Sequence, residues 1–202
     1  MADQIKTPGV YIVENNAFPP AVVGVETAVP AFVGYTERAA FKGKALNNIP
    51  FKLTSMTEFE TAFGGPAVPR FTLVGPGDSR RQQPVMLDTG EYRVVRVEPS
   101  EQQYLLWQAM RMFFDNGGGA CWIVSVGSHD DMIALGDEAS GLLAGIAALK
   151  GEIEPTMLVI PEGVRLSRAD SIRLQQAMLA HCGEDMKNRF AILDIHDGDQ
   201  PL

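Results

Sequence analysis

The feature of this chain that most constrains its fold is a regular alternation of helix-like and strand-like segments from residue 100 onward. The strand-like runs are short, apolar and rich in β-branched residues, and the segments between them are long enough to form helices. Because strands joined through helices form parallel pairs, the alternation predicts an α/β fold, a mainly parallel sheet flanked by helices. In chain order, we expect a strand at 29–35, a helix at 101–115, a strand at 120–126, a helix at 138–149, a strand at 156–160, a helix at 167–183 and a strand at 189–195.

Side-chain caps and glycines mark where several of these helices are expected to begin and end. A Ser followed three residues later by Glu, Gln or Asp is typical of a helix start. The run 116–119, Asn-Gly-Gly-Gly, predicts a helix C-cap, because a phosphate-binding loop needs the opposite order of strand, glycines and helix. The apolar residues of 101–115 cover more than one face, which predicts a well-buried helix. The expected starts are Ser55 with Glu58, Ser100 with Gln103, and Ser167 with Asp170, and Gly64-Gly65-Pro66 is expected to end the first helix.

Residues 66–99 differ in character from the rest of the chain. They hold three strand-like runs separated by turn-forming residues, with a polar, glycine-rich and proline-rich segment at 75–84. This pattern predicts antiparallel strands with an exposed tip, inserted into the α/β core. The runs are 71–74, 85–87 and 91–97.

Composition excludes several classes of protein. The 202 residues and an apolar fraction of 46% fit one domain with an insertion. A net charge of -8 argues against a nucleic-acid partner, which needs clustered Lys and Arg. No apolar run approaches the ~20 residues of a membrane helix, and no secretory signal opens the chain, so we expect folding in a cytoplasm without direct membrane insertion. Cys121 and Cys182 are expected to be buried free thiols.

The strongest candidate for chemistry follows the last expected strand, where open α/β sheets place ligands. Asp194 and His196 would share one face of that strand, and Asp197 and Asp199 come next. A closed metal site needs further ligands, and no other His stands at a ligand-like spacing, so a solvated turn is the favoured interpretation. We therefore expect no catalytic, cofactor-binding or metal-ligating residue and no enzyme activity.

The N-terminal segment has the character of an extended arm. A proline and a glycine are followed by four residues that favour a strand, and a loop separates them from the next strand at 29–35. A strand so isolated has an unsatisfied edge, and it must pair with its own sheet or with another molecule's. The arm strand is Thr7, Pro8, Gly9, Val10, Tyr11, Ile12 and Val13.

Five short motifs in the same order give the chain a resemblance to the contractile tail sheath protein family. Each motif is modest alone, and the order makes the combination specific. The sequence of residues 25–32, Val-Glu-Thr-Ala-Val-Pro-Ala-Phe, is most similar to that of the sheath proteins of extracellular contractile injection systems. These systems are phage-tail-like particles released by bacteria. The five motifs are residues 7–11, 29–36, 53–65, 113–124 and 189–194.

The resemblance implies a structural role. Sheath subunits stack as hexameric rings in a helix around an inner tube, between a baseplate and a terminal cap, and contraction drives the tube through a target envelope. Residues 1–28 would be the arm that pairs with a neighbouring copy, with a hinge at 15–26, and residues 29–202 would be the core domain. Family members normally continue past residue 202 into a second arm, so the resemblance implies that this C-terminal part is missing.

Two alternatives stay open. A bacteriophage virion tail sheath is the near alternative, because the subunit sequence separates it poorly from an injection-system sheath; the product is a virion in one case and a released extracellular particle in the other. A doubly wound α/β enzyme or nucleotide binder is the alternative from a different class. That reading needs a glycine turn after a strand or convergent catalytic residues, and stabilisation by nucleotides or divalent metals would reveal it.

Overall fold

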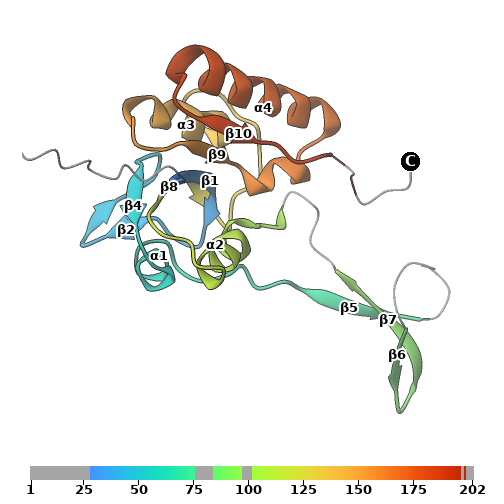
Figure 1. The fold of residues 1–202 in the computed structure, drawn as a ribbon. Coiled ribbons are helices and arrows are strands. Elements are labelled where there is room, and N and C mark those ends of the chain that lie inside the picture. The colour runs from blue at the N-terminus through green and yellow to red at the C-terminus, as the bar shows by residue number, and fades with distance from the viewer. Residues whose placement is uncertain (1–27, 76–83, 97–101, 197, 199–202) are drawn as a thin grey trace, which may run out of the picture.

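A five-stranded sheet forms the centre of the molecule (Figure 1). The structure is a computed structural model, and it describes residues 28–75, 84–96, 102–196 and 198. Four strands are parallel, and β4 joins one edge in the antiparallel sense. The mixed α/β fold with a mainly parallel sheet is therefore confirmed. The strand order is β10 (Phe190–Ile192), β9 (Met157–Val159), β1 (Pro30–Thr36), β8 (Cys121–Ser128) and β4 (Phe51–Leu53).

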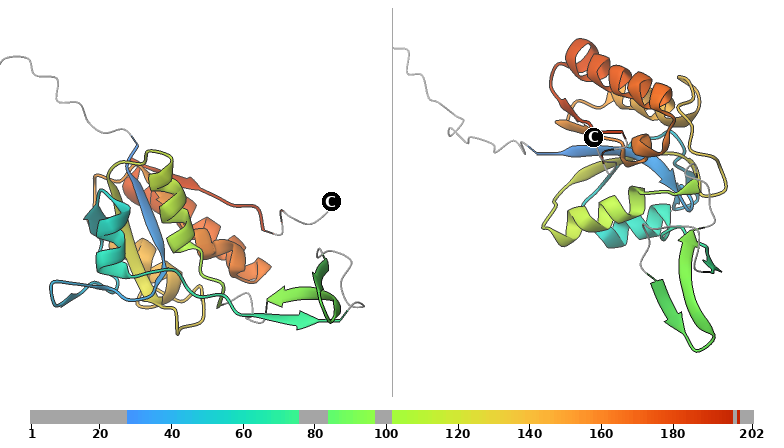
Figure 2. Two further views of the ribbon diagram at one scale, coloured as in Figure 1. Left: turned by 90° about the horizontal axis from the view of Figure 1, so that it is seen from below. Right: turned by 90° about the vertical axis from the view of Figure 1, so that its right-hand side faces the viewer.

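Helices cover the sheet in two layers, which Figure 2 shows from two further directions. One layer holds α1 (Met56–Phe63) and α2 (Leu106–Asp115), and the other holds α3 (Gly141–Ala148) and α4 (Arg168–Ala180). Alternate residues of β1 face the two layers, because side chains of a strand point to opposite sides. Phe32 packs with α1 and α2, while Ala31 and Val33 pack with α3 and α4.

The first helix begins and ends where the sequence predicts. Ser55 caps α1, since its hydroxyl accepts a hydrogen bond from the backbone N–H of Glu58 at 3.3 Å. The Glu58 carboxylate accepts in turn from the backbone N–H of Thr54 at 2.7 Å. Gly64 ends the helix with a φ of 86°, a conformation that glycine adopts without strain.

The start of α2 differs from the prediction. The helix begins at Leu106 rather than at residue 101, and its N-cap residue, Leu105, offers no side-chain cap. The backbone N–H groups of Leu105 and Leu106 donate instead to the carboxyl of Glu162, at 3.1 and 2.9 Å. Ser100 lies outside the described residues. A distant carboxyl therefore satisfies the helix start that a local Ser was expected to cap.

The burial of α2 also differs from the prediction. Only Leu106 and Met110 of the helix are fully buried, and Met112 is 69% exposed. The helix therefore buries one face, and the expectation of a helix buried on several faces is wrong. Its C-terminal end is as predicted, because Gly117 takes a φ of 83° and the N–H of Gly118 bonds the carbonyl of Phe113 at 2.9 Å.

The second half of the chain follows the predicted alternation. The helix expected at 138–149 is α3, which begins at Gly141 and continues into the short 3-10 helix η2 (Leu149–Gly151). Leu142, Ile146 and Leu149 lie buried along it. Ser167 caps α4 by accepting from the N–H of Asp170 at 3.2 Å. The helix does not end near residue 183, because a π-helical segment, η4 (His181–Met186), extends it.

The predicted insertion forms a separate small sheet that projects from the core (Figure 1). Its three strands are antiparallel, as the sequence pattern predicts, and their order is β5-β7-β6. Most of the expected tip at 75–84, namely residues 76–83, and the arm strand Thr7–Val13 lie outside the described residues. The strands are β5 (Phe71–Val74), β6 (Pro84–Leu87) and β7 (Gly90–Arg96); a two-stranded hairpin of β2 (Ala40–Phe41) and β3 (Lys44–Ala45) was not predicted.

Glu162 holds the layers together from inside the protein. It belongs to the 3-10 helix η3 (Pro161–Arg165), directly after β9, and its side chain is fully buried. Gly34 of β1 passes so close to the carboxyl that any side chain at that position would clash with it. Burial raises the pKa of Glu162 to about 7, although the hydrogen bonds from Leu106 and Leu105 act in the opposite direction.

This pKa predicts that Glu162 itself contributes stability at acidic pH, and that this contribution is lost as the pH rises from 4.5 to about 7. In that window the folded state holds a proton that the unfolded state has released, so folding is favoured on the acidic side. The loss is on the order of 3 kcal/mol in the free energy of unfolding. Glu162→Gln keeps the shape and removes this titration, while the buried His181, whose pKa is lowered to about 4, keeps its opposite pH dependence in both proteins. The stability of wild type relative to Glu162→Gln should therefore fall as the pH rises over this range.

Urea denaturation of wild type and Glu162→Gln at pH 5 and pH 8 measures the effect. Glu60→Gln, on the exposed side of α1, is the matched control and should keep the wild-type profile. Equal pH dependence in wild type and Glu162→Gln would rule out Glu162 as the source.

Candidate subunit interface

Strand β10 is an open edge of the sheet. One side of β10 pairs with β9, with Phe190 opposite Met157 and Ile192 opposite Val159. Within the part of the chain that the structure describes, no strand pairs with its other side. An open edge presents backbone N–H and C=O groups to any strand that approaches it.

An apolar row runs from the core out to this edge. Register places Phe32, Val159 and Ile192 side by side on three neighbouring strands, on the face that α2 covers. Phe32 is buried against the ring of Phe113, with centroids 5.5 Å apart, whereas Ile192 is 43% exposed. Phe190, on the same face of β10, is 56% exposed. The helical layer therefore stops before the edge, and the apolar face continues uncovered.

Arg189 anchors this exposed strand to the body of the protein. The residue precedes β10 and is only 7% exposed. Its guanidinium donates to the carbonyl of Leu149 at 3.4 Å and to the carbonyl of Glu152, at the C-terminal end of α3 and η2. Such carbonyls attract a cation, because the negative end of the helix dipole lies there. Asn188 adds a bond to the carbonyl of Ile153 at 2.7 Å.

His181 stays neutral beside this cation. It is buried, and its Nε2 atom lies 3.4 Å from Nη1 of Arg189. Burial and the charge of Arg189 lower the pKa of His181 to about 4. Since arginine can only donate, Nε2 of His181 is the acceptor, and the proton lies on Nδ1. The neutral ring thus adds another partner to the anchor of β10.

The segment after β10 holds the residues that were the strongest candidates for chemistry. Together with α4, it borders a groove of about 500 Å³. The carbonyl of Asp194 accepts from Gln175 at 2.7 Å, and Nε2 of His196 bonds the carbonyl of Leu166 at 3.1 Å. Asp197 and Asp199 lie outside the described residues. No group of three or more potential metal ligands occurs among the residues that the structure describes.

The two cysteines are free and buried, as predicted. Burial raises the pKa of Cys121 to about 12, and it also raises the pKa of Cys182. A thiol with a raised pKa supplies little thiolate at neutral pH, so neither residue is an activated nucleophile.

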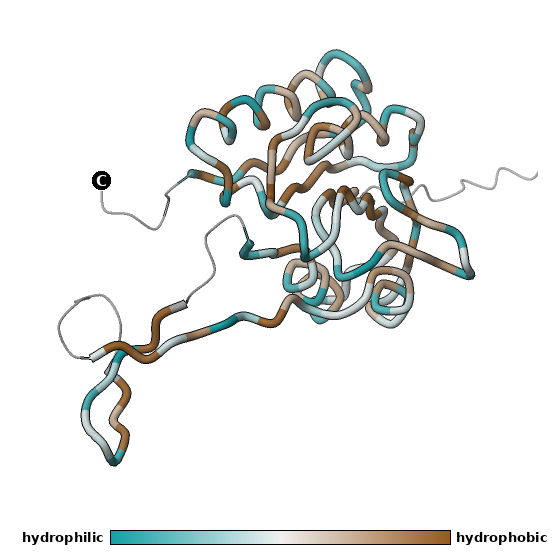
Figure 3. Tube along the Cα trace, turned by 180° about the vertical axis from the view of Figure 1, so that it is seen from behind, coloured by the Kyte–Doolittle hydropathy of each residue, from teal (hydrophilic) through white to brown (hydrophobic). Residues whose placement is uncertain are grey.

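The projecting insertion carries a second uncovered apolar face. Register puts Phe71 and Leu73 of β5 on the same side as Val85 and Leu87 of β6. These four side chains are between 36% and 57% exposed. Figure 3 shows hydrophobic residues along these strands, away from the core. Exposed apolar patches of this kind are typical of surfaces that contact other molecules.

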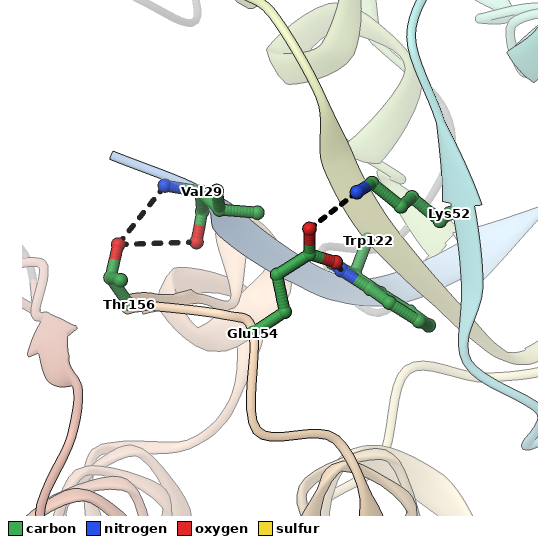
Figure 4. A network of polar contacts seen from close by, with 5 residues as sticks. All are labelled: Val29, Lys52, Trp122, Glu154 and Thr156. Carbon is green, nitrogen blue, oxygen red and sulfur yellow. Dashed lines mark hydrogen bonds and ion pairs between the residues drawn. The ribbon is translucent and has the colours of Figure 1, made fainter. Parts of the chain in front are cut away.

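A polar network surrounds the point where β1 begins (Figure 4). The backbone of Val29 bonds to Thr156, whose hydroxyl accepts from the N–H of Val29 at 3.0 Å. Nearby, the carboxylate of Glu154 accepts from Nε1 of Trp122 at 2.9 Å and pairs with the ammonium of Lys52. The hydrogen bond from Lys52 in particular holds the pKa of Glu154 below its usual range. This network ties β4 and β8 to the loop before β9, beside the beginning of β1.

Comparison with known proteins adds no identity: no family model matches the chain, and a search of curated proteins found no match. Within the described ranges, no helix is both long and apolar enough to cross a membrane.

The sequence predicts β10 as the last strand, but it gives no signal for the role of Arg189, which fixes this strand in place. Glu154 and Glu162, which connect other elements of the fold, have no signal either. Their partners are distant in the sequence, 40 residues away for Arg189 and Leu149 and 56 for Glu162 and Leu106. No local spacing marks such pairs.

Replacing Arg189 with Leu should loosen β10 selectively. The substitution leaves buried carbonyls without a donor, which costs about 2–4 kcal/mol in the free energy of unfolding. Hydrogen exchange should accelerate at the amides of β10 more than at those of β1. Arg173→Leu is the control, because Arg173 is an exposed residue of α4 whose ion pair with Asp170 is worth under ~1 kcal/mol. Uniform acceleration across the sheet would contradict a local anchor.

Proposed function

We propose that this protein is a structural subunit of the contractile sheath of a phage-tail-like injection system. Copies assemble as stacked hexameric rings around an inner tube, between baseplate and cap proteins, and contract to drive the tube through an envelope. The observation that carries the proposal is the open edge of β10, with an uncovered apolar face on a firmly anchored strand. The five ordered motifs of the sequence support the same function.

The arm of one copy pairs with β10 of another. Addition of a strand to an open edge uses main-chain hydrogen bonds, and alternate side chains supply specificity. Val10 and Ile12 would lie on one face of the added strand. On the face shared with Phe190 and Ile192, they extend the apolar row that the α2 layer leaves uncovered. The pairing thereby covers both the backbone edge and the apolar face.

The arm is long enough to reach a neighbour. Between residue 13 and residue 28, an extended chain spans at most ~50 Å. A compact core of roughly 150 residues has a radius of gyration of about 15 Å. The arm strand therefore reaches past the edge of its own core and across much of the next one.

The same geometry supports contraction as rigid-body movement. Arg189 anchors β10, and β1 is paired on both sides, so the sheet can move as a unit while arms keep the copies connected. The energy of contraction then resides in the difference between two packings of the same subunits, with no nucleotide consumed in the stroke.

Deleting residues 1–14 should abolish assembly and leave the core folded. The deletion removes the strand that pairs between copies and no described part of the core. Negative-stain electron microscopy of the protein expressed from its complete reading frame should show hollow helical tubes, and the deletion variant should show none. Circular dichroism should give an unchanged melting temperature. Normal tubes from the deletion variant would contradict the proposed pairing between the arm of one copy and β10 of another.

Charging the edge tests the other partner of this contact. The double variant Phe190→Lys with Ile192→Lys should stop tube formation, since charges on an edge strand oppose the addition of another strand. Both side chains are already exposed, so the unfolding free energy should change by less than about 1 kcal/mol. Val68→Lys, at a residue that is 84% exposed, is the control and should still give tubes. Tubes from the double variant would exclude β10 as the acceptor of the arm.

A further inference from the structure

An apolar groove lies beside the residues that lead from the arm into β1. It has a volume of about 650 Å³ and lies between the beginning of β1 and the C-terminal half of α2. The glycine turn that follows α2 closes one end. The residues that shape it are Ala28, Phe32, Ala109, Met112 and Phe113.

The local geometry explains why this groove is both apolar and open. Ala109, Met112 and Phe113 lie on one face of α2, because residues three and four apart on a helix are neighbours. Phe113 meets Phe32 edge to face and forms the floor. Gly118 leaves room above this ring, since a side chain at that position would clash with Phe113. Met112 stands at the rim with 69% of its surface exposed.

The chain itself leads an apolar segment to this groove. Ala28, the first residue that the structure describes, is part of the lining. The run Ala21-Val22-Val23-Gly24-Val25 comes just before it, and Val25 is only three residues from Ala28. Three residues span at most ~10 Å, so the run starts within reach of the groove. Covalent attachment gives it a high effective concentration there, which a separate molecule does not have.

We propose that residues 22–25 of the chain's own arm dock in this groove. The valines cover Met112 and the aromatic floor, while Glu26 and Thr27 bridge to β1. The consequence for assembly rests on the proposed function. Docking shortens the free part of the arm from at most ~50 Å to ~30 Å between residue 13 and its point of attachment. The hinge then narrows from residues 15–26 to residues 15–21.

A disulfide test identifies the occupant in the unassembled protein. Val23→Cys with Met112→Cys, in the full chain, should form an intramolecular disulfide about ten-fold faster than a control pair. The control pair joins Val23→Cys to Leu179→Cys, an exposed position on α4 in the opposite helical layer. The native thiols do not interfere, because both are buried with raised pKa values. Disulfide-linked dimers alone would assign the groove to a second copy of the chain. Equal rates of disulfide formation for the two pairs would show that the arm does not dock in the groove. Either result overturns the proposal.

Proteolysis with a protease that cleaves after glutamate gives an independent measurement. Glu14 and Glu26 lie on the two sides of the docked run, so cleavage at Glu26 should be slower than at Glu14. Met112→Glu places a charge at the apolar rim and should raise cleavage at Glu26 several-fold, with Glu14 unchanged. Leu179→Glu should alter neither site. Equal cleavage at the two glutamates in wild type would overturn the proposal. Both tests use the monomer, so their outcome is independent of tube formation. The docking proposal can fail while tubes still form, and it can hold even if tubes never form.

Discussion

The strand β1 is the element on which the other elements of the core depend. It pairs in parallel with β8 on one side and with β9 on the other, and its side chains are buried on both faces. Residues 28 and 29 lead into β1 from the proposed arm. In the proposed sheath, a pull on the arm along β1 would load the hydrogen bonds to both neighbouring strands at the same time, because those bonds run across the strand. An edge strand with a single partner would resist such a pull less.

Two buried polar side chains connect the strands of the sheet to the ends of the helices that cover it. Glu162 joins the end of β9 to the start of α2, and Arg189 joins the start of β10 to the end of α3. In both cases one side chain satisfies two backbone groups of another element, at the helix terminus whose dipole suits its polarity. Loss of such a group leaves backbone atoms buried without partners, which costs more than the contact itself contributes. The helical layers are thereby fixed relative to the sheet.

The sequence predicted the elements whose signals are local. The apolar run at 29–35 became β1, Ser55 capped α1, and the alternation after residue 100 became the parallel sheet. The prediction failed where a distant group is decisive: α2 starts at Leu106, where the backbone N–H groups of Leu105 and Leu106 donate to the carboxyl of Glu162. Strand β4 was missed because three residues give no period to detect, and their pairing with β8 comes from tertiary contact. The expected arm strand and the expected role of the charged residues after β10 stay predictions, because Thr7–Val13, Asp197 and Asp199 lie outside the described residues.

The proposed contact between copies also decides what kind of assembly forms. Arm and β10 are different surfaces, so the proposed contact is heterologous, and each copy offers one donor and one acceptor to its neighbours. Such head-to-tail contacts generate rings or helical arrays, the geometry that a sheath needs. The same open edge invites unwanted pairing, and the net charge of -8 opposes it through repulsion between free copies. If the arm's own valines dock beside β1, its reach is limited as well. Only a neighbour held close by other contacts, such as the apolar face of the insertion, then receives the strand.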